Sequence, residues 1–427
     1  MLRVAVIADD LTGAADTGIQ FCRPEAPTYL LGYDHIRSFP FPESPHSLSL
    51  FTNTRNVNAE QAGNTVNRVA SAIKNLNPEF IYKKIDSCLR GNIGAELDAL
   101  AESMGYEVTF VSSALPAQGR TILHDVHYLR GVPLAETEMA RDPVSPVRES
   151  RVSVLLGRQS RYEVARVDLD ILEGRLEELV AYIRRLIRRR VKHLVFDAST
   201  QNHLDRIASL ALAHFPKCLL VGSAGLASSL SRILFPSTEG TQNLQDPVGK
   251  RILFVCGSAS EVLKAQIEEL LRTSACSSYT LDPSELASSA GKMKIEDLSR
   301  AAAKDLISGS VVLKIRPPGL SPSPANGQEI LRGLTELVLS VMNDVRPDGI
   351  FLSGGDTASA LWNALDAEAI LLGQELLPGF VLGTFCKGPL HGLPVVVKPG
   401  AFGASDALVR IYDMLTAGKD QNHGSKP

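Results

Sequence analysis

Residues 3–16 read RVAVIADDLTGAAD and carry the signals that decide the fold. The apolar run at residues 3–8 predicts a strand buried on both faces, as the strands of parallel sheets are. Two aspartates follow the run directly, and a stretch with helical character opens behind them. A strand, a polar turn and a helix in this order form the repeating unit of α/β proteins.

The same alternation continues along the whole chain. Further strands are predicted at residues 47–52, 80–84, 108–112, 152–156, 193–197 and 218–222, and in the second half at 252–256, 278–281, 311–315, 349–353, 380–384 and 394–398. Helical patterns lie between them, including residues 59–76, 172–190, 263–273 and 327–345. We therefore expect an α/β fold with largely parallel sheets flanked by helices.

The chain is too long for one core. It has 427 residues, whereas single hydrophobic cores stop growing at roughly 250–300 residues. The polar segment PSTEGTQNLQDPVG at residues 236–249 is the best linker because it is rich in turn residues and separates two series of strands and helices. We expect one domain at residues 1–240, a second at 241–420, and a disordered tail at 421–427.

The composition of the chain limits which partners the protein can bind and in which compartment it is expected. The formal net charge is −3, which suggests neither a nucleic-acid partner nor an anionic membrane. The six cysteines form no C-x-x-C pair, and their scatter fits a reducing compartment. The apolar N-terminal run is too short for a signal peptide, and the apolar stretch at 207–230 is interrupted by His214, Pro216 and Lys217. A cytoplasmic protein is expected.

Polar clusters follow three of the predicted strands of the first half, where ligands bind in open α/β sheets. In the first, Asp9 and Asp10 can orient a hydroxyl, accept its proton or hold Mg²⁺; the alternative is that Asp10 only caps a helix. In the second, Arg55 can bind a carboxylate through two parallel hydrogen bonds, or else form a surface ion pair.

The third cluster is the densest and reads KKIDSCLRGNIG at residues 83–94. Cations beside a glycine turn that exposes backbone amides favour an anion site. Asp86 within it is a candidate general base for a substrate hydroxyl. The alternative is an ion-pair network that caps a helix.

Three small-residue loops in the second half each follow a predicted strand, at residues 256–260, 353–358 and 398–403. Each is weak evidence alone, but together they favour phosphate binding at helix N-termini. Neither G-x-x-x-x-G-K-[ST] nor G-x-G-x-x-G occurs, so a P-loop kinase and an ordinary dinucleotide enzyme are not supported.

Five longer motifs resemble one known family, the four-carbon acid sugar kinases. IADDLTGAADTG at 7–18, KKIDSCLRGNIG at 83–94 and RGVPLAETEMARDP at 130–143 are similar to the N-terminal domain of that family. LSGGDTA at 352–358 and KPGAFG at 398–403 are similar to its nucleotide-binding domain. The motifs occur in the family's order through nearly the whole chain. One departure is Ala259, where relatives often carry cysteine.

The resemblance implies a two-domain ATP-dependent kinase with its active site in the cleft between the domains, acting on the terminal hydroxyl of threonate, erythronate or 3-oxo-tetronate. It implies substrate contacts from Asp10, Arg55, Lys84, Ile85, Asp86 and Ser87, and ATP contacts from Ser258, Gly354, Gly355, Asp356, Thr357 and Gly400. No metal ligands can be named, although Mg²⁺ on the phosphates is expected. A homodimer is compatible with the sequence.

For the reaction, we assign catalytic roles to Asp86, Asp10, Lys84 and Arg90. Asp86 is the first choice for the base and Asp10 the second; Lys84 and Arg90 are candidates to neutralise the transferring phosphoryl group. Two other functions stay open: a sugar-acid sensor that binds both ligands without transfer, and a lyase or isomerase acting on a phosphorylated acid. The sequence does not choose among the four-carbon acids.

Overall fold

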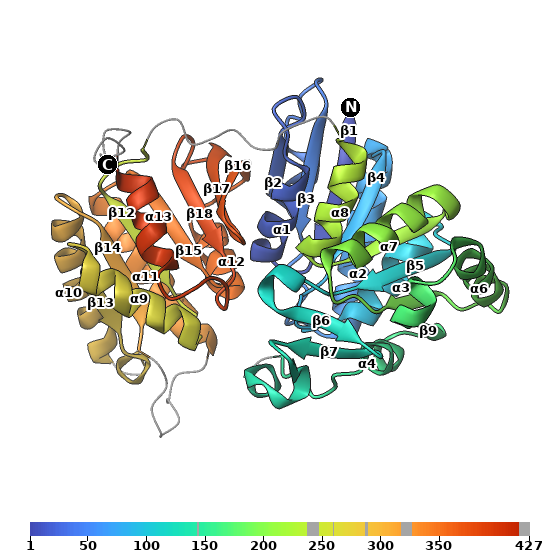
Figure 1. Cartoon of the computed structure of the whole chain (residues 1–427). Coiled ribbons are helices and arrows are strands. Elements are labelled where there is room, and N and C mark those ends of the chain that lie inside the picture. Colours follow the sequence, from blue (N-terminus) through green and yellow to red (C-terminus); the bar gives the residue numbers. More distant parts are fainter. Residues whose placement is uncertain (143–144, 237–246, 259, 287–288, 317–326, 418–427) are drawn as a thin grey trace, which may run out of the picture. The chain divides into compact units, whose positions relative to one another are not determined.

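The computed structural model describes residues 1–142, 145–236, 247–258, 260–286, 289–316 and 327–417. Figure 1 shows the chain, which divides into two compact units, Met1–Gly240 and Thr241–Pro427. Most of the predicted linker and the whole predicted tail lie outside the described residues.

Unit 1 is built on a parallel sheet. Its strands are β1 (Leu2–Ala8), β2 (Thr28–Gly32), β3 (His46–Phe51), β4 (Phe80–Lys84), β5 (Val108–Ser112), β9 (Val164–Val167), β10 (His193–Phe196) and β11 (Cys218–Gly222). They lie in the order β2-β3-β1-β4-β11-β5-β10-β9, and every neighbouring pair is parallel. The side chains of β1 are almost all buried, as its apolar sequence predicts.

The helices of unit 1 pack in two groups, α2 with α3 and α4, and α8 with α1 and α7 (Figure 1). Their bounds are α1 (Leu11–Gly18), α2 (Ala59–Leu76), α3 (Ile93–Met104), α4 (Val152–Gln159), α5 (Leu169–Leu172), α6 (Leu176–Arg188), α7 (Gln201–His214) and α8 (Ala224–Leu234). Short 3₁₀ helices lie at η1 (Ile19–Phe21), η2 (Tyr33–Arg37), η3 (Pro116–Gln118), η4 (Leu134–Glu136) and η5 (Glu138–Arg141). No described helix has the length and apolar character needed to cross a bilayer.

A small antiparallel sheet is inserted into unit 1, formed by β6 (Arg120–Leu123), β7 (Val126–Leu129) and β8 (Val132–Pro133). His124 and Asp125 make the β6–β7 turn with φ of 50° and 70°. The Asp197 carboxylate accepts both of their amides, at 2.7 and 2.9 Å. These two hydrogen bonds fix a turn whose positive φ values are unfavourable for residues other than glycine.

Unit 2 has a mixed sheet. Its strands are β12 (Ile252–Cys256), β13 (Ser277–Leu281), β14 (Val311–Ile315), β15 (Gly349–Ser353), β16 (Ala369–Leu377), β17 (Phe380–Lys387) and β18 (Pro394–Lys398). In the order β13-β14-β12-β15-β18-β17-β16, the first five are parallel and β17 is antiparallel to both neighbours. Its helices are α9 (Glu261–Thr273), α10 (Ser289–Leu306), α11 (Gly327–Asp344), α12 (Gly355–Ala364) and α13 (Ala407–Thr416), with η6 at Pro283–Glu285.

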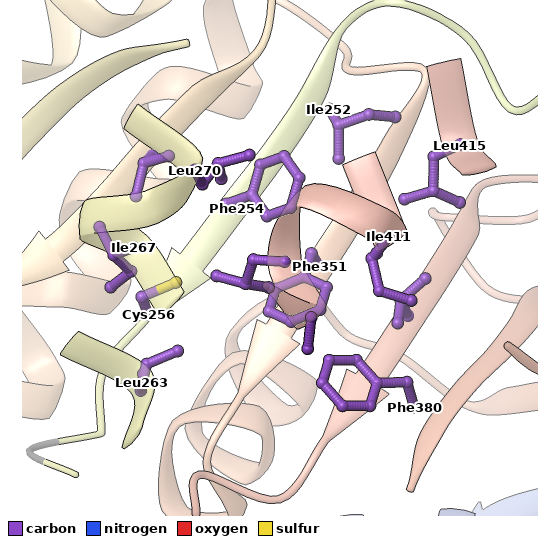
Figure 2. Close-up of a cluster of buried hydrophobic side chains, with 14 of the residues drawn as sticks. Ile252, Phe254, Cys256, Leu263, Ile267, Leu270, Phe351, Phe380, Ile411 and Leu415 are labelled. Carbon is purple, nitrogen blue, oxygen red and sulfur yellow. The ribbon is translucent and has the colours of Figure 1, made fainter. Parts of the chain in front are cut away.

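The core on one face of this sheet is aromatic and aliphatic (Figure 2). Phe351 lies between Phe254 and Phe380, with ring centroids 5.2 and 6.4 Å away. Ile267 of α9 and Ile411 of α13 close the cluster from the helix side. Burying side chains of this size contributes about 1.5–3 kcal/mol each, and this burial holds both helices against the sheet.

The structure corrects several sequence-based expectations. The strand predicted at residues 152–156 is wrong, because this segment begins α4. Val152, Leu155 and Leu156 are its buried residues, and that spacing of three and four belongs to a helix. The helix predicted at 172–190 begins at Leu176. Strands β2, β9 and β16 were not predicted, and β16 and β17 make the second sheet less parallel than expected.

Candidate active site

The carboxyl ends of β3, β1 and β4 meet at one edge of the unit 1 sheet. Ala8 pairs with Phe51, and Ile7 pairs with Lys83, so the three strands end at nearly the same level. The residues that follow them are the three clusters singled out in the sequence. The fold thus brings Asp10, Arg55 and the segment after Lys84 to one place, as expected of open α/β sheets.

Arg55 connects the carboxylates of two clusters. Its Nε donates to Asp9 Oδ2 at 2.6 Å, and its two terminal nitrogens donate to Asp10 at 3.0 and 2.7 Å. One of them also lies 3.7 Å from Asp86 Oδ1. Burial raises the pKa of Asp9, but Arg55 and the nearby lysines outweigh this, so its pKa is lowered overall. Asp9 is therefore ionised, and one guanidinium orients both adjacent aspartates.

Asp10 also caps helix α1. Its Oδ1 accepts the amide of Gly13 at 3.0 Å, and its Oδ2 accepts the hydroxyl of Thr12 at 2.7 Å. The cap interpretation is therefore correct, but it does not account for the fork with Arg55. A cap stabilises by about 1 kcal/mol and needs no buried arginine.

Asp86 and Arg90 form a bidentate pair. Arg90 donates its Nε to Asp86 Oδ2 at 2.8 Å and its Nη2 to Oδ1 at 3.1 Å. Its Nη1 donates to Asp142 Oδ2 at 3.3 Å. Burial raises the pKa of Asp86, yet Arg90, Arg55 and Lys84 together hold it well below its usual range. The turn includes Leu89 at φ 64°, a strained conformation for leucine.

Asp142 is a residue that sequence reasoning missed. It lies in the motif at 130–143, which was quoted for its resemblance but given no role. Pro143, the last residue of that motif, is outside the described residues. The signal that could have identified Asp142 is the presence of an acidic residue within a long, specific motif. Its pairing with Arg90 could not be inferred from the spacing of the two residues.

The two adjacent lysines of β4 have different surroundings. Lys83 is fully buried, and its Nζ lies 2.6 Å from Glu96 Oε2 on α3. Lys84 Nζ lies 3.9 Å from Asp16 Oδ1, longer than a hydrogen bond. Burial lowers the pKa of Lys84, but Asp16, Asp10, Asp9 and Asp86 raise it overall, so Lys84 is an ammonium. Lys83 is structural, whereas Lys84 faces the acids of the site.

The other residues of this segment are also enclosed. Ile85 donates its amide to Gly222 O at 2.9 Å, and Ile85 and Ser87 are both buried.

His127 was not predicted from the sequence; its Nδ1 lies 3.2 Å from Ser113 Oγ. Burial and the charge of Arg120 lower the pKa of His127 to about 4, so this histidine is neutral near pH 7.

Asp9 carries a buried oxygen without a partner. No hydrogen-bond donor reaches its Oδ1 in the part of the chain that the structure describes. A buried acceptor in this state costs free energy, which a donor from a ligand would recover.

The part of the chain that the structure describes contains no group of three or more His, Cys, Asp or Glu side chains placed to hold a metal ion.

A cavity of about 360 Å³ lies beside this cluster. The residues that line it include Arg55, Arg90, Asn92, Arg148 and Arg158. Arg158 pairs with Glu149 at 3.3 Å. Arg148 and Arg158 were not singled out in the sequence, because they lie between motifs.

In unit 2 the structure brings the three small-residue loops together. Strands β12, β15 and β18 are neighbours, with Cys256 paired to Ser353 and Ser353 to Lys398. Ser258 lies between two glycines: a side chain on Gly400 would collide with its Cβ and Oγ, and one on Gly354 would meet its Cβ at 3.4 Å. Gly354 also has φ 102°, which only glycine adopts readily.

This loop cluster is suited to a phosphate. Gly355 begins α12, so the first-turn amides of that helix, including those of Asp356 and Thr357, are not used by the helix itself. Ser258 and Ser260 precede α9, and Ser258 Oγ accepts the amide of Ser260 at 3.3 Å. Ala259, the departure noted in the sequence, lies outside the described residues.

Comparison with known proteins agrees with this division. A family described as "Sugar-binding N-terminal domain" matches residues 4–230, and one described as "Nucleotide-binding C-terminal domain" matches residues 253–408. A D-threonate kinase from Salmonella typhimurium is 31% identical over 97% of this chain and 99% of its own length. The chain belongs to the four-carbon acid sugar kinase family. It is therefore a phosphotransferase with an alcohol group as acceptor.

Other members of the family are also similar along their full length. A D-erythronate kinase from Heliobacterium modesticaldum is 28% identical, covering 97% of each chain. A 3-oxo-tetronate kinase from Pectobacterium atrosepticum is 24% identical, covering 98% of this chain and all of its own. Because relatives with three different names have similar identities, the family is clear while the particular acid is not.

Solved structures share the fold. One from Salmonella typhimurium has a TM-score of 0.77 at 22% identity, covering 96% of this chain and 99% of its own. One from Haemophilus influenzae has a TM-score of 0.70 at 20% identity, covering 96% and 100%. At these identities the comparison shows the α/β fold alone.

Proposed function

We propose that this kinase transfers the γ-phosphoryl group of ATP to the terminal (4-) hydroxyl of a four-carbon acid sugar in the cytoplasm. Threonate, erythronate and 3-oxo-tetronate are the candidates. The observation that carries the proposal is the convergence of Asp9, Asp10, Arg55, Lys84, Asp86 and Arg90 on the carboxyl edge of the unit 1 sheet. Such a site can hold an anion and orient hydroxyls at once.

For the carboxylate of the acid, Lys84 is a stronger candidate than Arg55. All three nitrogens of Arg55 already donate to Asp9 and Asp10, whereas Lys84 Nζ lies 3.9 Å from Asp16 Oδ1, beyond hydrogen-bond distance. An ammonium on a flexible stem can turn towards a ligand at little cost. Arg55 would then set the positions of the two aspartates that bind the hydroxyls. Ile85 and Ser87, which are neighbours of Lys84 and Asp86 in the chain, would contact the same substrate.

The proton acceptor is proposed among three aspartates. Asp86 was the first choice and Asp10 the second, and both carboxylates are occupied by arginine and backbone donors. Asp9 joins them because no donor from the described residues reaches its Oδ1. A base with a low pKa suffices if the proton leaves late, since phosphoryl transfer depends mainly on position and charge neutralisation.

The nucleotide is proposed to bind unit 2 through Ser258, Gly354, Gly355, Asp356, Thr357 and Gly400. Gly354 and Gly400 approach Ser258 closely and carry no side chain of their own, so their backbone would be accessible to the phosphates of a bound nucleotide. Mg²⁺ would supply charge neutralisation on those phosphates. The described acids do not form a cage of their own for it, which fits an ion held chiefly by phosphates and water.

The test is ADP release by the purified chain with ATP and Mg²⁺ over a panel of acids. The panel holds D- and L-threonate, D- and L-erythronate and the 3-oxo-tetronates, with glycerate and a plain sugar as controls. Turnover with a four-carbon acid and none with the controls is expected. If no acid of the panel causes release of ADP, while thermal shifts show that ATP and an acid bind, the result would favour a sensor instead.

A further inference from the structure

Lys398 is a buried cation directly behind the proposed phosphate loops. It ends β18 and is fully excluded from solvent. Its Nζ donates to Gln266 Oε1 at 2.8 Å and to Gly400 O at 3.0 Å. Gly400 is the residue whose backbone approaches Ser258. The lysine is thus one hydrogen bond away from the loop that faces the phosphates.

Gln266 holds the same loop from the side of α9. Its Nε2 donates to Phe402 O at 3.0 Å and to Ala404 O at 2.8 Å, while its Oε1 accepts from Lys398. Gln266 is also fully buried. Two side chains therefore bind three alternate carbonyls of the segment 400–404, those of Gly400, Phe402 and Ala404. A loop held this way loses little entropy when a ligand binds it.

The surroundings of Lys398 contain little negative charge. No described carboxylate forms an ion pair with it, and the other neighbours are Gln266 of α9 and the Phe380 ring of β17, 5.5 Å away. Phe380 belongs to the apolar cluster of Figure 2. Cys256 of β12 acts on it only weakly, because burial raises the pKa of that thiol to about 12, despite Lys398 and Lys314 of β14.

We propose that Lys398 and Gln266 are positioning residues of the nucleotide site: together they hold the loop 400–404 in its phosphate-accepting form, and the Lys398 ammonium adds attraction for the phosphates. This inference rests on the proposed function, because it needs nucleotide to bind unit 2. Because no carboxylate of the described residues forms an ion pair with Lys398, a bound polyphosphate would supply its counter-charge.

The proposal has a pH signature. Burial lowers the pKa of Lys398 to about 7. A bound phosphate favours the ammonium and raises this pKa, so nucleotide affinity is highest below about pH 7 and falls as pH rises through the interval between the free and bound values. A shift of one pKa unit on binding corresponds to about a tenfold loss of affinity at high pH.

The experiment is calorimetric titration of the full chain with ATP and excess Mg²⁺ between about pH 6 and pH 9. The dissociation constant of the unaltered protein should rise about tenfold over this range. Lys398→Arg, which keeps the charge, should lose most of the rise, and Lys398→Met should bind weakly at every pH. Lys264→Met, on the exposed face of α9, should keep the original profile and so serves as the control for the replacement of a lysine.

The outcomes separate the two proposals. Binding that is independent of pH in the unaltered protein, or that Lys398→Met leaves unchanged, would overturn the role of Lys398. This first comparison needs no variant, so it stands even where Lys398→Met fails to fold. Gln266→Leu should weaken ATP binding and, because it removes an acceptor of the Lys398 ammonium, should move the pH midpoint downward. Unchanged binding in that variant would remove Gln266 from the role. Absence of ATP binding at any pH would overturn the nucleotide site and this inference with it.

Discussion

The two terminal nitrogens of Arg55 donate to the two carboxylate oxygens of Asp10, at 3.0 and 2.7 Å. Planar guanidinium and planar carboxylate match in this geometry, and lysine cannot reproduce it. Since the third nitrogen of Arg55 donates to Asp9, one side chain fixes both aspartates.

Arg55→Lys should therefore lower kcat/KM for the acid about 10²-fold, because misplacing a catalytic group by about 1 Å has that effect. Steady-state kinetics at saturating ATP measure it. Arg300→Lys is the matched control: it changes an exposed arginine that pairs with Asp297 on the surface of α10, and activity should not change. Normal kinetics for Arg55→Lys would show that the fork is not needed for catalysis.

Replacing the two lysines of β4 should have different effects, one on stability and the other on turnover. Lys83→Met leaves Glu96 buried without its 2.6 Å partner, so it should destabilise the chain by about 3–5 kcal/mol. Adding Glu96→Gln should restore part of that loss. Lys84→Met should instead lower turnover about 10²-fold, as loss of one charged donor does. Denaturant unfolding and kcat distinguish these effects, and a stable, active Lys84→Met protein would contradict the assignment.

Asp86→Asn tests the proposed base and should cut turnover by more than about tenfold. The measurement is kcat with both substrates saturating. Near-normal turnover would leave Asp10 or Asp9 as the acceptor, and the equivalent asparagine variants would then decide between them.

The same variant should change acid stability. Because the folded pKa of Asp86 is far below its ordinary value of 3.8, ionised Asp86 stabilises the fold above that pH, and the stabilisation is lost as pH falls below it. Asp86→Asn has no such titration, so its thermal midpoint should decline less steeply with acid below about pH 4. Parallel curves for the two proteins would mean that the pKa of Asp86 is not depressed.

Gly400→Ala should weaken ATP binding without affecting the acid site. The added methyl group would collide with the side chain of Ser258. Overpacking of this kind costs about 1–3 kcal/mol, or about tenfold and more in Kd. In Gly309→Ala the new methyl group meets nothing within 4 Å, so ATP binding should not change. Equal affinities in the two variants would place the phosphates elsewhere.

Local pattern was a good guide where an element is buried on both faces or has clear caps. Helix α2 was predicted at its observed bounds, and Asn58 caps its start. Strand β1 was found within one residue. The segment at 152–156 failed because β-branched residues resemble a strand until their burial at spacings of three and four is known. Strand β9 is only partly buried, so its apolar signal was weak.

The sequence by itself determined the α/β class, the family and the three polar clusters, because each depends on residues adjacent in the chain. Only the tertiary structure decided which polar side chains meet: Arg55 with Asp9 and Asp10, Arg90 with Asp142, and Lys398 with Gln266. These pairs join segments 45 to 132 residues apart. Spacing along the chain carries no information about them, since strand order and register bring the partners together.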